Sequence, residues 1–117
     1  PAAERYEAKL AVSAFGPRLQ RPAFANFGPW VGLAAPGERI VSAYPGGGYA
    51  AWSGTSMASP LAAGVAALVW ARNPDWKPVD VVKRLQDRST AMCGQTGLRA
   101  LHAHGAVADF VPRDPAC

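Results

Sequence analysis

A hydroxyl side chain stands where this sequence could present a nucleophile. Ser56 follows a glycine and a threonine and opens a long run of small and apolar residues that ends just before Pro74. We expect a helix over about residues 56–72, because proline disfavours helix in the residue before it. The first N–H groups of a helix lack intrahelical acceptors and favour negative charge beside them. A serine placed here could therefore attack an acyl group, and those N–H groups would stabilise the oxyanion of the tetrahedral intermediate.

The same residues also admit a purely structural interpretation. Serine and threonine are preferred N-caps, so Thr55 or Ser56 could serve only to cap a buried helix. Pro60 is expected in the first helical turn, where its missing N–H removes no hydrogen bond. Small residues between Ala62 and Ala67 predict a helix that is buried on most of its sides. Spacing alone leaves both interpretations open.

The residue types of this segment are a more specific signal than the spacing of its hydroxyl groups. Residues 54–60 read Gly-Thr-Ser-Met-Ala-Ser-Pro, and Ala-Gly-Val-Ala-Ala-Leu follows at 63–68. This combination resembles the active-serine segment of the subtilisin-like serine proteases. The resemblance covers residues 5–110 in the family's order, including the Phe-Ala-Asn-Phe-Gly-Pro of 24–29 and the Ala-Ala-Pro-Gly of 34–37. It implies a serine endopeptidase that hydrolyses peptide bonds of polypeptide substrates.

The resemblance also implies roles for residues around the serine. Ser56 would be the acylating nucleophile and its N–H one donor of the oxyanion hole, which the Thr55 hydroxyl would support. Trp52 would lie on the leaving-group side of the cleft and, with Ser53, contact the substrate. A packed core aromatic is the alternative for Trp52, as a helix cap is for Thr55. Leu61 replaces a histidine that is not the family's catalytic base, so this difference leaves the expected activity unaffected.

The expected partners of Ser56 do not precede it in the sequence. Subtilisin-like proteases use an aspartate, a histidine and an oxyanion asparagine before the serine, whereas His102 and His104 follow it. The residues from Pro1 to Val12 resemble the piece after that asparagine. We therefore expect residues 1–117 to be the C-terminal portion of a peptidase domain. It would depend on the missing N-terminal part to fold well and would be inactive alone.

Two other interpretations remain. Ser56, Asp87 and His102 follow the chain order of an α/β-hydrolase triad, after an elbow-like Gly54-x-Ser-x-Ala58. That fold needs more strands before the serine than this chain supplies, and strands after it where we expect helices. The chain could instead be a non-catalytic remnant that only binds or scaffolds. An aspartate and a histidine upstream in the parent reading frame would decide between them.

Composition narrows the class of protein. Half of the 117 residues are apolar, 17% are charged, and there are 12 glycines and 11 prolines, which indicates a folded α/β protein rich in turns. The net charge of +4 is scattered, so nucleic-acid binding is not expected. The apolar stretch from Leu61 to Ala71 is too short for a membrane span.

No cofactor is expected. Gly32 replaces an aspartate that the family often has near a weak cation site, so no metal is placed in this chain, although its parent could hold structural calcium.

The two cysteines, Cys93 and Cys117, could form a surface staple or be unrelated free thiols. The family resemblance implies an extracellular or cell-surface parent, in which we expect them to be oxidised to each other. Closing a loop of about 25 residues would contribute roughly 3 kcal/mol in the chain-entropy model.

Alternation and turn residues predict the elements that position these groups. Strands are expected over 9–15 and 30–35, and a hairpin-like pair over 39–44 and 49–53. A second helix should begin near Lys77, with Val79, Val82 and Leu85 or Gln86 on one face, and a short third helix should lie within 100–110. Together these predict an α/β fold. It would be the C-terminal part of a subtilisin-like three-layer sandwich with a mostly parallel sheet and a central buried helix carrying the serine.

Overall fold

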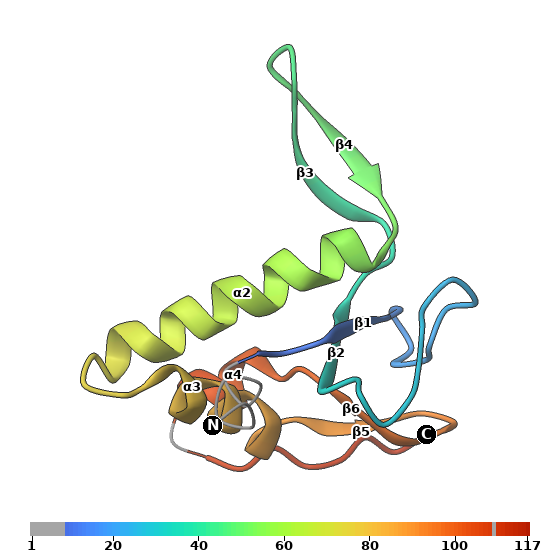
Figure 1. The fold of residues 1–117 in the computed structure, drawn as a ribbon. Coiled ribbons are helices and arrows are strands. Elements are labelled where there is room, and N and C mark those ends of the chain that lie inside the picture. Colours follow the sequence, from blue (N-terminus) through green and yellow to red (C-terminus); the bar gives the residue numbers. More distant parts are fainter. Residues whose placement is uncertain (1–8, 109) are drawn as a thin grey trace.

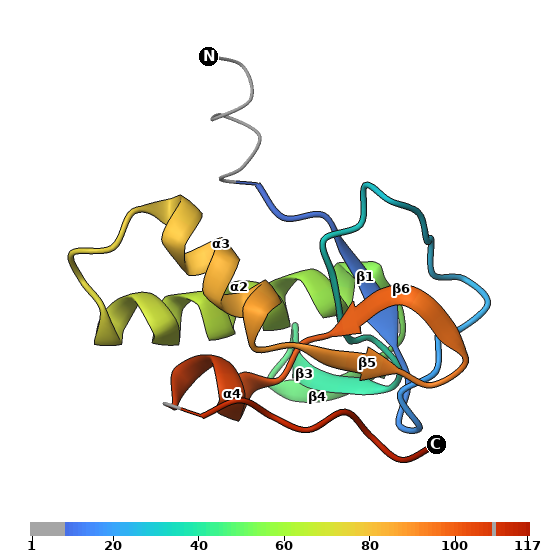
Figure 2. The same ribbon diagram turned by 90° about the horizontal axis from the view of Figure 1, so that it is seen from below.

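The computed structural model describes residues 9–108 and 110–117 (Figures 1 and 2). Of the segment from Pro1 to Val12, which resembles the piece after the family's oxyanion asparagine, residues 1–8 lie outside the described part. The remainder leads into the first strand.

Four strands form the main sheet, in the order β1-β2-β6-β5. β1 (Val12–Phe15) is parallel to β2 (Leu33–Pro36), and β2 is parallel to β6 (Gln95–Ala100). β5 (Thr90–Met92) runs antiparallel to β6. The mostly parallel sheet is thus confirmed. The expectation that only helices follow the serine is wrong, because β5 and β6 do so. The two strands form a short hairpin that turns at Gly94, whose φ is 69°. Strands of this length do not give a clear alternating pattern in the sequence.

A separate two-stranded ribbon stands away from this sheet (Figure 1). β3 (Ile40–Tyr44) and β4 (Gly48–Trp52) are antiparallel and are joined by a turn whose two glycines, Gly46 and Gly47, have φ of 99° and 89°. Positive φ is accessible to glycine without a Cβ penalty, which explains this turn. The expected hairpin is confirmed.

Three helices follow at the expected places: α2 (Thr55–Arg72), α3 (Pro78–Asp87) and α4 (Ala103–Val107). The start of α3 is fixed by a capping interaction in which the Asp80 carboxylate accepts the Lys77 N–H at 2.9 Å. The buried face of α3 differs in part from the expected one. Val81 and Leu85 are buried, whereas Val79 and Val82 are only half-buried, because they face a surface cavity rather than the core.

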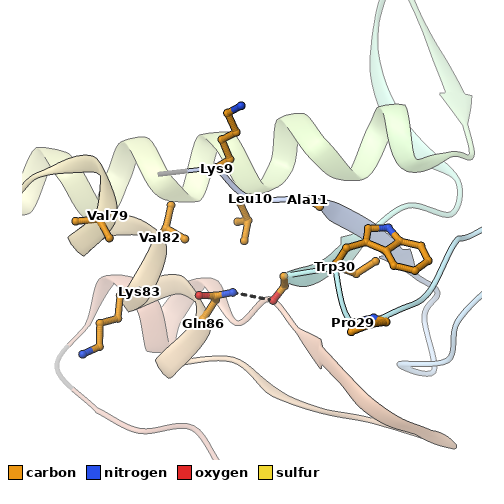
Figure 3. A pocket seen from close by; sticks show the side chains of 11 residues that line it. Lys9, Leu10, Ala11, Pro29, Trp30, Val79, Val82, Lys83 and Gln86 are labelled. Carbon is orange, nitrogen blue, oxygen red and sulfur yellow. Dashed lines mark hydrogen bonds between the residues drawn. The ribbon is translucent and has the colours of Figure 1, made fainter. Parts of the chain in front are cut away.

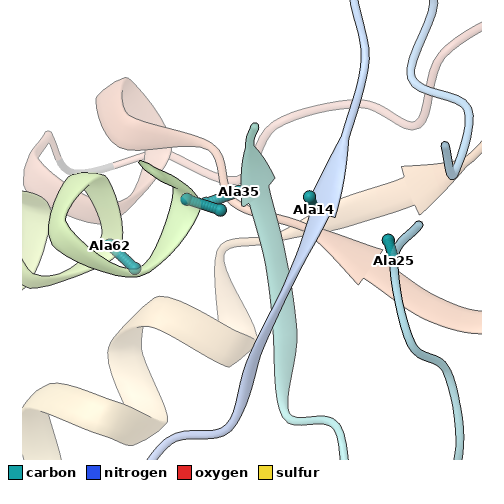
Figure 4. Packing of buried hydrophobic residues seen from close by; sticks show 5 residues of the cluster. Ala14, Ala25, Ala35 and Ala62 are labelled. Carbon is teal, nitrogen blue, oxygen red and sulfur yellow. The ribbon is translucent and has the colours of Figure 1, made fainter. Parts of the chain in front are cut away.

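The helices pack on one face of the main sheet. Ala35 of β2 lies in a cluster with Ala58 and Ala62 of α2, where small side chains let the helix lie close to the strands (Figure 4). Leu33, two residues earlier on the same face, packs with Leu85 and others of a second cluster. Ala34 belongs to a cluster on the opposite face. The described residues therefore supply two layers, a sheet and its helices.

α2 is buried on one side only. Ala58, Ala62 and Val69 are its buried residues, whereas Leu68 is 56% and Trp70 43% exposed. The burial on most sides was expected for the complete domain, and the part of the chain that the structure describes covers α2 along one side. The helix is apolar nearly all round, as helices in the core of a larger protein are, but the described residues provide packing partners along one side. In the part of the chain that the structure describes, no helix combines the length and apolarity that crossing a bilayer requires.

Pro60 also differs from its expected position. Because α2 begins at Thr55, Pro60 is the sixth helical residue and lies beyond the first turn. Its missing N–H leaves the carbonyl of Ser56 without its usual intrahelical donor. The helix nevertheless continues to Arg72.

Candidate active site

The start of α2 is fastened to the carboxyl ends of β1 and β2. The Gly54 N–H donates to the Gly37 carbonyl at 2.8 Å, and the Gly37 N–H donates to the Phe15 carbonyl at 3.0 Å. Gly37 is required for this approach, since a Cβ there would lie 2.5 Å from the Ala14 Cβ and 3.0 Å from the Gly54 oxygen. Ligand sites of open α/β sheets lie outside the carboxyl ends of their strands. The first turn of α2 is therefore held where such a site is expected.

Gly54 makes the turn that exposes Ser56. Its φ of 156° and ψ of 163° belong to a region that only glycine occupies readily. Gly54 is itself the N-cap, and no side chain caps the helix, so Thr55 and Ser56 do not serve as caps. The Gly54 carbonyl accepts the N–H groups of Met57 and Ala58 at 3.1 and 3.3 Å. Ser56, the second helical residue, precedes these donors, so its own N–H has no acceptor within the helix.

The exposed Ser56 opens on a cavity of about 370 Å³ between the hairpin and the first turns of α2. Apart from two serines, the lining is apolar and includes one aromatic residue. The lining residues are Ile40, Val41, Ser42, Ala43, Trp52, Ser56, Met57, Pro60 and Leu61. A hydroxyl nucleophile, a helix N-terminus and an apolar cavity are thus adjacent, an arrangement that suits acyl transfer from a substrate with apolar side chains.

The other expected site residues are only partly brought together. Trp52 lines this cavity and is 55% exposed, so it is not a packed core aromatic in this chain. The Ser53 hydroxyl instead accepts the Arg39 N–H at 2.9 Å and closes the base of the hairpin. Thr55 is half-buried. Neither Ser53 nor Thr55 lines the cavity.

The contribution of β3 to this site was not predicted from the sequence. Four consecutive residues of β3 line the cavity, and the ring of Tyr44, at the end of that strand, packs against the ring of Trp52. The expected hairpin left the pairing of its strands open, and it is the observed register that places Tyr44 on the same face as Trp52.

The residues of the α/β-hydrolase alternative are not brought together. Asp87 is exposed at the end of α3 and lines a different surface hollow. The Nδ1 of His102 accepts the Gly105 N–H of its own helix at 2.9 Å. The rings of both histidines pack against Phe110. Neither Asp87 nor His102 lines the cavity beside Ser56, so that self-contained triad is not formed.

A second cavity, of about 380 Å³, lies at Gly32, between the start of β1 and α3 (Figure 3). The Gln86 amide donates to the Gly32 carbonyl at 3.3 Å, and a Cβ on Gly32 would lie 2.5 Å from Leu10. Two lysines, Lys9 and Lys83, line this cavity, and none of its lining residues is acidic. Among residues 9–108 and 110–117, no three His, Cys, Asp or Glu side chains gather in a way that could hold a metal ion. The expectation that no cation binds at Gly32 remains a prediction.

The C-terminal tail is held against β5. A disulfide joins Cys93 to Cys117, with Cα atoms 5.7 Å apart. Asp114 of the tail accepts the Ala91 N–H at 2.8 Å and lies 3.7 Å from the Arg99 guanidinium. Nearer α4, the Arg88 guanidinium donates to the Phe110 carbonyl. The tail therefore covers the edge of β5 and satisfies one of its N–H groups.

Comparison with known proteins agrees with the resemblance drawn from the motifs. The profile of the Subtilase family matches residues 2–106. M-protease of Shouchella clausii (strain KSM-K16) is 42% identical over 94 residues, which are 80% of this chain and 24% of M-protease. Subtilisin Savinase of Lederbergia lenta is 40% identical over 94 residues, which are 80% of this chain and 35% of that protein.

Solved structures share the fold. A cold adapted subtilisin-like serine proteinase superposes with a TM-score of 0.77 at 35% identity, covering 85% of this chain and 38% of that protein. The self-cleaved protease domain of PatA gives a TM-score of 0.73 at 36% identity, covering 86% and 40%. The chain thus spans 24% to 35% of the length of the two curated relatives described above. The family profile, the identities and the shared fold together show that this chain belongs to the Subtilase family.

Proposed function

We propose that this chain carries the nucleophile of a subtilisin-type serine endopeptidase, with Ser56 as the residue that is acylated by polypeptide substrates. The observation that carries the proposal is the exposed Ser56 at the N-terminus of α2, open to an apolar cavity, in a chain of the Subtilase family. In the proposed reaction, Ser56 Oγ attacks the scissile carbonyl, a histidine takes its proton, and the amine leaves with that proton. The Ser56 N–H donates to the oxyanion, and the Thr55 hydroxyl supports this hole.

The histidine and aspartate of this proposal come from residues outside these 117. Both histidines of the chain lie in or next to α4 and pack on Phe110. A serine hydroxyl without an adjacent base is a weak nucleophile at neutral pH. The chain is therefore proposed to act as the C-terminal portion of a peptidase domain and to be inactive alone.

The partner of this portion is the preceding part of the same domain. Leu68 and Trp70 are exposed on α2 although both are large and apolar, and an apolar face of this kind requires a covering surface. The Cys93–Cys117 disulfide supports a parent that works outside the cell, where disulfides persist.

Labelling of the native peptidase that contains this chain tests the role of Ser56. A fluorophosphonate should modify Ser56, and Ser56→Ala should abolish the labelling, as read by peptide mass spectrometry. Ser59→Ala is the matched control, since Ser59 is also exposed in the first turns of α2 but does not line the cavity. Labelling that persists in Ser56→Ala would refute the assignment. Absence of any labelling would favour a non-catalytic scaffold.

A further inference from the structure

The hairpin beside Ser56 carries two aromatic side chains on one face. The antiparallel register pairs Tyr44 with Gly48, Ser42 with Ala50, and Ile40 with Trp52. Because alternate residues of a strand share a face, Tyr44 and Trp52 lie on the same side of the ribbon, with the Ser42–Ala50 pair between them.

The two rings meet across that small pair. The ring centroids of Tyr44 and Trp52 are 5.8 Å apart and the planes are inclined by 72°, which is an edge-to-face contact. Four residue steps along an extended strand span roughly 13 Å, so both side chains must lean toward each other. The small side chains of Ser42 and Ala50 leave room for this, and Gly48 opposite Tyr44 offers no side chain on which its ring could pack instead.

The contact matters because Trp52 is poorly enclosed. Trp52 lines the cavity that also contains Ser56, but its side chain and that of Tyr44 are about half exposed, at 55% and 49%. An aromatic side chain with few neighbours samples several rotamers, and fixing it when a substrate binds costs conformational entropy. Because the Tyr44 ring holds the Trp52 indole before a substrate binds, this entropic cost of binding is smaller.

We propose that Tyr44 is a positioning residue for the leaving-group side of the site. The inference rests on the proposed function, in which Ser56 is acylated and Trp52 contacts the substrate beyond the scissile bond. Tyr44 holds the Trp52 indole at the cavity wall, opposite the apolar Pro60 and Leu61 of α2. The enzyme therefore favours substrates with a bulky apolar side chain after the scissile bond.

Paired substrates test this in the native peptidase. One is a peptide with leucine directly after the scissile bond, and the other has the same acyl part but ends in a methyl ester, whose small leaving group does not reach Trp52. Tyr44→Leu should raise KM for the peptide about three- to tenfold, the factor that an aromatic pair typically contributes. It should leave kcat for the peptide and both constants for the methyl ester unchanged. Tyr44→Phe keeps the ring and should behave as the wild type.

Two further variants separate positioning from a structural effect. Tyr49 lies on the opposite face of the hairpin, is 79% exposed and does not line the cavity, so Tyr49→Leu should leave both substrates unaffected. In a Trp52→Leu background, Tyr44→Leu should have no further effect if it acts through the indole. Equal losses on both substrates, or an undiminished effect in that background, would overturn the inference. A wild-type protein that cleaves neither substrate would refute the proposed function and this inference with it.

Discussion

At the scale of single residues, the site depends on two glycines as much as on the serine. Gly54 adopts a φ of 156° that turns the chain into α2 and exposes Ser56. Gly37 lets the end of β2 lie against that turn, because any side chain there would overlap Ala14. Their carbonyl and amide groups are joined by a 2.8 Å hydrogen bond, so the position of the nucleophile is set by backbone rather than by side chains.

This gives a prediction for Gly37. Gly37→Ala should lower the free energy of unfolding by about 1–3 kcal/mol, the usual cost of overpacking, because its Cβ would lie 2.5 Å from the Ala14 Cβ. Gly48→Ala is the control, since a Cβ at Gly48 meets nothing within 4 Å and should change stability by less than about 0.5 kcal/mol. Denaturant unfolding of the native protein measures both. A Gly37→Ala variant as stable as Gly48→Ala would contradict the close approach.

At the scale of elements, the tail and β5 form one unit although 20 residues or more separate them in the sequence. The Asp114 carboxylate on the Ala91 N–H and the Cys93–Cys117 bridge, directly after β5, act between them, and the Arg99–Asp114 ion pair joins the tail to the neighbouring β6. The ion pair is largely exposed, so we assign it little energy. The disulfide and the hydrogen bond are the contacts that hold the tail on the strand edge.

The state of the cysteines is therefore a prediction about this unit. In the native protein, alkylation without reduction should find no free thiol at either position, as read by non-reducing peptide mapping. Replacing both cysteines by serine should lower the free energy of unfolding by about 2–4 kcal/mol. It should also speed amide exchange of Ala91, whereas Arg113→Ala at an exposed tail position should do neither. Two thiols that alkylate without reduction would rule out the bridge.

At the scale of the whole molecule, the chain has a core on one side of its central helix and an exposed apolar face on the other. Val69 is buried against Leu33 and Leu85, whereas its neighbours Leu68 and Trp70 are exposed. The N-terminal end of α2, whose second residue is Ser56, lies beside the hairpin, while α3 and α4 pack toward the other half of the helix (Figure 1). The exposed face and the packing of both histidines on Phe110, rather than in the cavity beside Ser56, lead to the same expectation, that further chain is needed for catalysis.

The isolated chain tests that expectation. Expressed alone, the 117 residues should show no turnover of denatured casein above the blank, because triad members act as a unit and no histidine or carboxylate of the described residues lines the cavity beside Ser56. Robust turnover by the pure chain would contradict this. In that event His102→Ala would be the next variant, since only the self-contained hydrolase requires His102.

The sequence by itself determined the features whose causes are local. The turn at Gly46–Gly47, the helix that starts after Gly54 and ends near Pro74, and the Pro78 start of α3 were all predictable from neighbouring residues. Turn chemistry and helix ends act over a few positions, which is why patterns reveal them. The motif around Ser56 also identified the family, because a sequence motif of that length rarely occurs by chance.

Only the tertiary structure decided what depends on distant parts of the chain. The short β5 and β6 gain their partners from β2 and from the tail, and no local pattern announces such a pairing. The contact of Tyr44 with Trp52 follows from the register of a twisted ribbon. The burial of α2 depends on which chain packs against each of its sides, because a helix that is apolar all round does not indicate by its own sequence which face will be covered.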